Sequence, residues 1–150
     1  MGTRKPLALA LTILAYVLTT FAVQGASHFA INADHYAAVS FMRSEPVIPM
    51  GIAAMLIQGL LFGVLFNAFK RSPVRVWDGL VFSWALGAFL TSYVVLGEAG
   101  KYAVPSIASW IGVETSVAIV QFTVFGMLLG VIQRGDLPVA ASMATQKTRM

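Results

Sequence analysis

The stretch IGVETSVAIVQFTVFGMLLGVIQ, residues 111–133, decides the fold of this 150-residue chain. It is longer than the roughly 20 residues that a helix needs to cross a hydrocarbon core of about 30 Å, and its single acidic residue, Glu114, stands near its start. Residues 6–24, 47–69 and 77–96 form comparable stretches with no charge in their middle. The sequence therefore predicts an all-α protein, a four-helix transmembrane bundle of two hairpins in a single membrane domain.

The composition supports a membrane protein and excludes several functions. Hydrophobic residues make up 58% of the chain and charged residues 11%, too little charge for the surface of a soluble domain. The chain has no cysteine, which excludes disulfides, thiolate nucleophiles and cysteine-held metal clusters. The net charge is +4, but the sequence has no run of basic residues with aromatic residues between them, the pattern expected of a nucleic-acid-binding segment. We therefore expect the lipid bilayer as a partner, and neither a nucleic acid nor a cofactor.

Basic residues mark one side of the predicted spans. Every lysine and arginine except Arg43 and Lys101 lies before residue 6, between residues 69 and 77, or after residue 133. The positive-inside rule therefore places both termini in the cytoplasm. We expect a multi-pass protein of a bacterial inner (plasma) membrane. Its first span is predicted to be a retained helix, since Gln24 stands where signal cleavage needs a small residue.

The connections between the spans differ in length. Residues 70–76 form a short link, which predicts that the second and third spans are antiparallel neighbours. The first outer loop, residues 25–46, is long enough for a short interfacial helix over residues 35–43, with Asp34 as its N-cap and Pro46 after its end. The tail, residues 137–150, lacks a spanning apolar run and is predicted to be disordered.

Small residues recur at four-residue spacing in three spans. Such rows let helix backbones approach closely in a membrane, where close packing drives helix association. The rows are Gly59 with Gly63, Gly126 with Gly130, and Gly79 with Ser83 and Gly87. We expect them to pack inside one bundle. The alternative is an interface with another subunit.

Two amides lie near the middle of spans. Gln58 and Gln121 are costly there without partners, so we expect them to hydrogen-bond within the bundle, and a polar ligand or ion pathway is the alternative. An offset of 63 positions aligns Gln58 with Gln121, Gly63 with Gly126 and Arg71 with Arg134. This alignment hints at two related hairpins, although the first and third spans do not reinforce it.

No catalytic motif is visible, and the chain is predicted not to be an enzyme. It has neither a G-x-S-x-G elbow nor a glycine-rich phosphate loop. Polar side chains gather in the two outer loops and at the start of the last span. The candidate ligand-binding or partner-binding residues are His28, Asp34, His35, Arg43, Glu45, Glu98 and Glu114.

The histidines and Glu114 each have two interpretations. His28 and His35 would lie about 10.5 Å apart on one helix, so they share a metal ion only if the helix breaks near residues 32–34. We expect interfacial hydrogen-bonding histidines and no metal. Glu114 is expected to reach water at the outer interface, and partial burial is the alternative.

The order of these features resembles that of small bacterial four-helix integral membrane proteins. The residues that carry the likeness are Ser27-His28, Tyr36, Met42-Arg43-Ser44-Glu45 and the small-residue row with Gln121 in the last span. The likeness covers most of the chain, and it implies neither a known activity nor functional residues.

Three functions follow as hypotheses. The first is a non-enzymatic accessory, assembly or scaffolding subunit of a membrane complex, associated with other subunits or with itself. The second is a small oligomeric transporter or channel protomer, in which Gln58, Gln121 or Glu114 lines a hydrated cavity. The third is a protein that binds a ligand or a metal ion at its outer face through His28 and His35.

Overall fold

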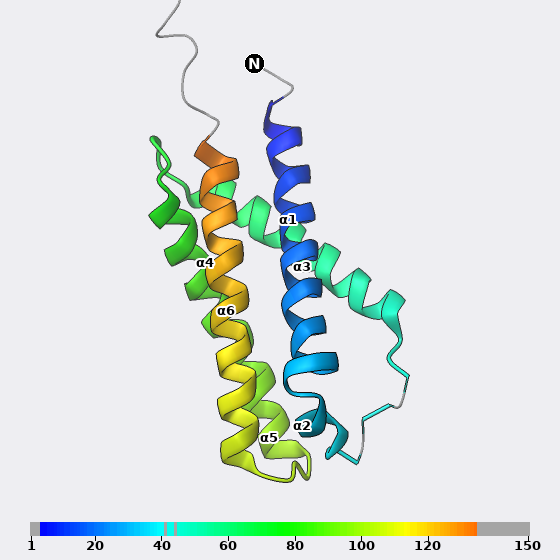
Figure 1. The fold of residues 1–150 in the computed structure, drawn as a ribbon. Coiled ribbons are helices and arrows are strands. Elements are labelled where there is room, and N and C mark those ends of the chain that lie inside the picture. Colours follow the sequence, from blue (N-terminus) through cyan, green and yellow to red (C-terminus); the bar gives the residue numbers. More distant parts are fainter. Residues whose placement is uncertain (1–3, 41, 44, 135–150) are drawn as a thin grey trace, which may run out of the picture.

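All regular structure is helical in residues 4–40, 42–43 and 45–134, which the computed structural model describes (Figure 1). Four helical stretches in this part are long and apolar enough to cross a membrane: Lys5–Ile31, Ile48–Phe69, Val76–Lys101 and Ile107–Gln133. The first consists of α1 (Arg4–Ala26) and the π-helical turn η1 (Ser27–Ile31). The third consists of α4 (Val76–Thr91), the π-helical turn η2 (Ser92–Leu96) and α5 (Gly97–Lys101). The second and fourth are α3 (Ile48–Phe69) and α6 (Ile107–Gln133).

The bundle has two ends. Helix α1 begins and α6 ends at the terminal end, and the short helices α2 (Ala33–Ala37) and α5 lie at the opposite, loop end (Figure 1). The chain therefore consists of two hairpins, α1 with α3 and α4 with α6. The tail that was predicted to be disordered, residues 137–150, lies outside the described residues.

Local sequence signals set the helix starts. Ser106 is the N-cap of α6, and its hydroxyl accepts a hydrogen bond of 3.3 Å from the backbone N–H of Ser109. At the start of α4, the carboxylate of Asp78 accepts a 2.7 Å hydrogen bond from the backbone N–H of Arg75. Pro49 stands in the first turn of α3, where a missing N–H costs nothing.

The predicted interfacial helix over residues 35–43 is wrong in its bounds. Helix α2 covers only Ala33–Ala37, and its N-cap residue is Asn32 rather than Asp34. After this helix the backbone tightens, because Val39 N–H bonds to the carbonyl of Tyr36 three residues back. The tighter turn directs Val39 into the bundle, where it is 3% exposed, and the helix cannot continue. The first, third and fourth spans also run further than hydropathy predicted.

Glycines bring the helices of each hairpin into backbone contact. A methyl group on Gly79 would stand 2.4 Å from the backbone nitrogen of Gly130, so α4 and α6 touch directly. A methyl group on Gly59 of α3 would stand 3.1 Å from the Cα of Ile13 in α1. Between α4 and α6, the buried hydroxyl of Ser83 donates a 2.8 Å hydrogen bond to the carbonyl of Phe122. The small-residue rows thus lie inside the chain's own interfaces.

Three aromatic rings join the two hairpins at the centre of the bundle. The ring of Tyr16 lies 5.1 Å from that of Phe62 and 4.9 Å from that of Phe125, and the two phenylalanine rings are 5.0 Å apart. Nearer the terminal end, the fully buried amide of Gln133 donates to Thr12 and accepts from Lys70. These contacts connect α1, α3 and α6.

Helix α3 leaves the bundle toward the loop end. It crosses behind α1 obliquely, and its beginning lies far from α4 (Figure 1). Residues 48–54 are all exposed, which for an apolar span means a surface available to lipid. The contact between α3 and α4 runs through Phe82, whose ring packs edge-on against Phe66 at 5.2 Å. The short link therefore makes these two helices neighbours only near the link itself.

Candidate functional site

A small polar cavity lies among the four spans on the loop-end side of the aromatic rings. Its volume is about 170 Å³, and every span contributes to its lining. The lining residues are Tyr16, Thr20 and Gln24 of α1, Gln58 of α3, Leu90, Thr91, Val94 and Val95 of α4 and η2, and Glu114, Ala118, Gln121 and Phe122 of α6. An engineered apolar cavity of about 150 Å³ holds benzene, so this central cavity is large enough for one small molecule or several waters.

Helix α1 supplies a polar stripe to the central cavity. Tyr16, Thr20 and Gln24 follow one another at four-residue spacing, so they share one face of the helix. The Tyr16 hydroxyl donates to Gln58 Oε1 at 2.8 Å, and Gln24 Nε2 donates to Gln121 Oε1 at the same distance. Gln121 Nε2 in turn donates to the Thr20 hydroxyl at 3.1 Å. These bonds offset the cost of placing amides inside an apolar span.

Gln58 and Gln121 both line the central cavity, as the transporter or channel hypothesis required. They do not hydrogen-bond to each other in the described structure. Each amide is held by α1 instead. Gln121 is 4% exposed and uses its oxygen and its nitrogen. Gln58 uses only its oxygen, so its amide N–H groups remain as donors beside the cavity.

Glu114 forms the loop-end wall of the central cavity. It lies seven residues before Gln121 on α6, about 10.5 Å along the helix axis. The hydroxyl of Tyr36 donates a 2.6 Å hydrogen bond to Glu114 Oε1. Within the described residues Glu114 has no other hydrogen bond and no salt bridge. Its second carboxyl oxygen is therefore available to a molecule in the cavity.

Tyr36 links Glu114 to the loop end of the bundle. Its hydroxyl also lies 3.3 Å from the Ser27 hydroxyl, which accepts a 3.0 Å hydrogen bond from Asn32 Nδ2. Burial raises the pKa of the Tyr36 hydroxyl above its ordinary value, and the neighbouring Glu114 raises it further. Tyr36 is therefore a neutral donor to the carboxyl group over the ordinary pH range.

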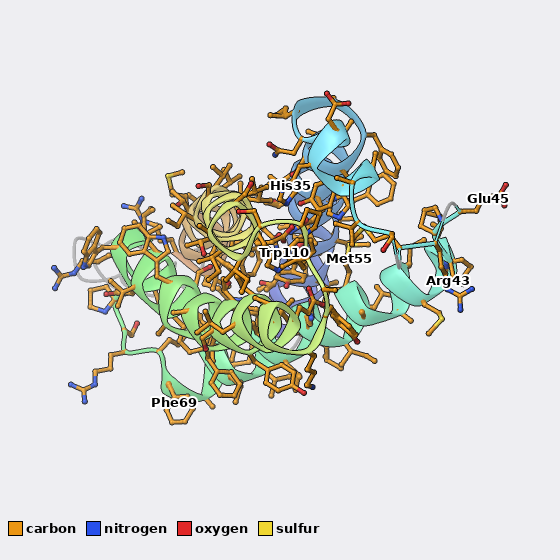
Figure 2. The ribbon with its side chains drawn as sticks, turned by 90° about the horizontal axis from the view of Figure 1, so that it is seen from below. His35, Arg43, Glu45, Met55, Phe69 and Trp110 are labelled. Atoms are coloured by element: carbon orange, nitrogen blue, oxygen red, sulfur yellow. The ribbon has the colours of Figure 1, made fainter. Side chains whose placement is uncertain are left out.

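Histidine and tryptophan rings surround Tyr36. The ring of His28 stacks on that of Tyr36 with centroids 3.7 Å apart, and His28 Nδ1 lies 3.0 Å from the carbonyl of Gln24. The ring of His35 stacks on Trp110 at 5.7 Å, and both lie at the core of the loop end (Figure 2). These four residues, His28, His35, Tyr36 and Trp110, form an aromatic cap on the loop-end side of Glu114.

The remaining candidate residues differ in their distance from the aromatic cap. Arg43 and Glu45 are exposed on the segment that leads to α3, far to one side of His35 and Trp110 (Figure 2). Asp34 is also exposed. Glu98 is partly buried in α5 and lies close enough to Tyr36 and Glu114 to interact with both electrostatically. Among the residues described, no three histidine, aspartate or glutamate side chains are grouped so that they could hold a metal ion.

Sequence reasoning missed the contribution of α1 to the central cavity. Tyr16, Thr20, Gln24 and Thr91 were not among its candidate site residues. One signal was present: three hydrogen-bonding residues at positions i, i+4 and i+8 of an apolar span mark a polar stripe. Each residue alone is ordinary in a membrane helix, so only the spacing was informative.

No protein-family model, curated protein or solved structure matches this chain. The chemistry of the site therefore has to be inferred from its own groups. Among the groups that line the central cavity, a Glu114 oxygen, Gln24 Oε1, the Gln58 amide N–H groups and the Thr91 hydroxyl have no hydrogen bond in the described structure. The Glu114 and Gln24 oxygens only accept hydrogen bonds, the Gln58 N–H groups only donate them, and the Thr91 hydroxyl can do both. The cavity therefore offers acceptors and donors, and the acceptors include one carboxyl group, that of Glu114.

Proposed function

We propose that the protein is a non-enzymatic, multi-pass protein of a bacterial inner membrane that binds a small amine-bearing molecule in its central cavity, as a small transporter does. The observation that carries this proposal is the joint lining of one polar cavity by all four spans, with Glu114 at its end. A polar cavity inside a membrane protein is costly to maintain, and intramembrane ionisable groups mark ligand or ion sites by default.

The carboxyl group and the free acceptors of the cavity favour an amine over other ligands. An ammonium group has three donors and no acceptor, which matches the Glu114 oxygen, Gln24 Oε1 and the Thr91 hydroxyl. A positive charge on the ligand would also compensate the carboxyl group, for which the described residues supply no basic partner. The rings of Tyr16 and Phe122, which line the same space, add a surface that attracts cations.

The geometry favours a binding site that is closed toward one end over an open channel. The rings of Tyr16, Phe62 and Phe125 pack against each other between the central cavity and the terminal end. A continuous pore would require these rings to separate. With the termini in the cytoplasm, as the positive-inside rule predicts, the cavity lies in the outer half of the membrane and takes its ligand from that side.

The small-residue rows give less support to the alternative of an accessory or scaffolding subunit. They suggested an interface with another subunit, but Gly59, Gly79 and Gly126 each pack against a neighbouring helix of the same chain. The exposed start of α3, residues 48–54, remains a surface on which a subunit would have room to pack. A stoichiometric partner retained in gentle purification would support this alternative.

The test is a titration of the purified protein in lipid nanodiscs by calorimetry. The probes are ethanolamine, choline and guanidinium, with uncharged ethylene glycol as the comparison. Glu114→Gln keeps the side-chain volume and an oxygen for Tyr36 but removes the charge, so amine affinity should fall at least about tenfold. The matched control is Glu45→Gln, which removes an exposed carboxyl group away from the cavity and should leave binding unchanged.

Two results would contradict the proposal. One is that none of the amine probes binds wild-type protein more tightly than ethylene glycol. The other is that Glu45→Gln weakens binding as much as Glu114→Gln, which would show that only the overall charge matters.

A further inference from the structure

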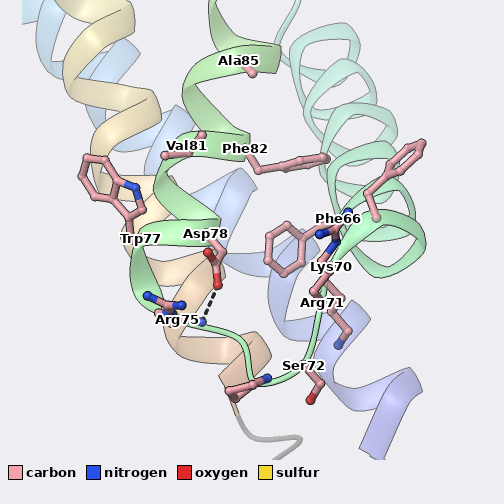
Figure 3. A pocket seen from close by; sticks show the side chains of 12 residues that line it. Phe66, Lys70, Arg71, Ser72, Arg75, Trp77, Asp78, Val81, Phe82 and Ala85 are labelled. Atoms are coloured by element: carbon pink, nitrogen blue, oxygen red, sulfur yellow. Dashed lines mark hydrogen bonds between the residues drawn. The ribbon is translucent and has the colours of Figure 1, made fainter.

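A second, larger groove lies at the terminal end of the bundle, between α3 and α4 (Figure 3). Its volume is about 620 Å³. Its wall is apolar and comes from both helices: Phe66 and Phe69 of α3, and Trp77, Val81, Phe82 and Ala85 of α4. Phe69 is 72% exposed and Trp77 is 60% exposed, so much of this wall would face lipid. We call it the basal groove.

Basic side chains form the rim of the basal groove. Lys70, Arg71 and Arg75 come from the link between α3 and α4, and all three line the groove (Figure 3). They stand against a single carboxylate, Asp78, which accepts a hydrogen bond from the backbone N–H of Arg75. Lys70 Nζ donates to Gln133 Oε1 at 3.0 Å, which fixes this amine against α6. Arg71 and Arg75 are exposed.

We propose that the basal groove binds an anionic phospholipid of the leaflet at the terminal end, with its phosphate at Arg71 and Arg75 and an acyl chain along the apolar wall. Guanidinium groups bind phosphate oxygens in a bidentate manner, and basic pockets between transmembrane helices suit anionic lipid headgroups. The apolar wall of α3 and α4 gives the acyl chain a surface that a free phosphate ion would not use.

The usual excess of basic residues on one side of a membrane does not account for this site by itself. Lys5 and Arg134 lie at the same end and are also exposed, but they do not line the basal groove. What distinguishes Arg71 and Arg75 is the adjoining apolar wall. The proposal therefore concerns the groove, and it is independent of amine binding in the central cavity.

The experiment is native mass spectrometry of the full chain after reconstitution with dioleoyl phosphatidylglycerol or with zwitterionic dioleoyl phosphatidylcholine. Wild-type protein should retain the anionic lipid preferentially. The double variant Arg71→Gln/Arg75→Gln should bind it roughly 30-fold more weakly, since each basic side chain at the lipid phosphate contributes about a fivefold factor. The matched control, Lys5→Gln/Arg134→Gln, removes the same charge from the same end and should stay within about threefold of wild type.

A second variant tests the apolar wall. Ala85→Trp keeps every charge but fills the wall, so it should also weaken retention of the anionic lipid. The proposal is overturned if wild type retains the two lipids equally, if both double variants lose the lipid to the same extent, or if Ala85→Trp has no effect. Complete displacement by millimolar inorganic phosphate would equally overturn it, because the site would then belong to the free ion.

Discussion

Adding one methyl group to Gly79 should destabilise the bundle more than any other glycine-to-alanine change in α4. The added Cβ would stand 2.4 Å from the nitrogen and 2.7 Å from the Cα of Gly130, and 2.6 Å from the carbonyl oxygen of Gly126. All three atoms belong to the backbone, so no side chain can turn away to make room. Helices α4 and α6 must therefore move apart.

The magnitude follows from that movement. Ordinary contact begins near 3.4 Å, so the helices have to separate by up to about 1 Å, which forfeits a quarter to a half of each dispersion contact along the interface. The separation also stretches the 2.8 Å hydrogen bond from Ser83 to the carbonyl of Phe122. Overpacking of this kind costs about 1–3 kcal/mol and a strained hydrogen bond about 1 kcal/mol more, so we expect a loss of about 2–4 kcal/mol.

The assay is equilibrium unfolding in mixed micelles, followed by circular dichroism as the fraction of denaturing detergent is raised. The matched control is Gly112→Ala on α6, where an added Cβ meets nothing within 4 Å. It should raise the free energy of unfolding by about 0.5–1 kcal/mol, because alanine restricts the unfolded chain and favours helix. The reasoning is refuted if Gly79→Ala is as stable as wild type, or if Gly112→Ala loses as much as Gly79→Ala.

Three other predictions concern the hydrogen bonds of the bundle. Gln133→Leu breaks the bonds to Thr12 and Lys70, so the same unfolding assay should show a loss of about 2 kcal/mol, and an unchanged stability would contradict this role. Gln121→Leu removes the amide that bonds to both Gln24 and Thr20 and should cost about 1–3 kcal/mol, whereas a neutral effect would mean that water replaces the amide. The pKa of Tyr36 is raised in the folded protein, so its neutral hydroxyl stabilises the fold below about pH 10, and this stabilisation is lost as the pH rises further. Thermal unfolding curves at pH 9 and pH 11 should therefore differ less for Tyr36→Phe than for wild type. Equal differences for the two proteins would contradict this role of Tyr36.

The spans were predictable because a helix that crosses a bilayer must be long and uncharged, and the hydropathy of the sequence shows such stretches directly. Their ends were not, because the helices continue into polar residues that find partners only in the folded chain. Ser27 is an example: it extends the first span beyond Gln24 because Asn32 and Tyr36 bond to its hydroxyl. The oblique course of α3 was likewise invisible, since it depends on where Gly59 and Gly63 meet α1.

The candidate site was predictable in part for a similar reason. Gln58, Gln121 and Glu114 stand out in apolar spans, and all three line the central cavity. Arg43 was grouped with them because it is a polar residue of the same outer loop as His35, yet in the structure it lies well away from His35, on the segment that leads to α3 (Figure 2). Distance along a loop says little about distance in space, whereas the fixed geometry of a helix makes spacing informative.

The central claim, that the cavity admits a small amine, is tested most directly by the reactivity of a single cysteine in this cysteine-free chain. Thr20→Cys places a thiol in the central cavity, and Thr115→Cys places one in the apolar groove between α4 and α6 outside it. The account predicts that methanethiosulfonate ethylammonium, itself a small amine, modifies Thr20→Cys quickly, that ethanolamine or choline slows this reaction, and that Thr115→Cys reacts slowly in either case. Equal and slow modification of both variants would contradict the claim.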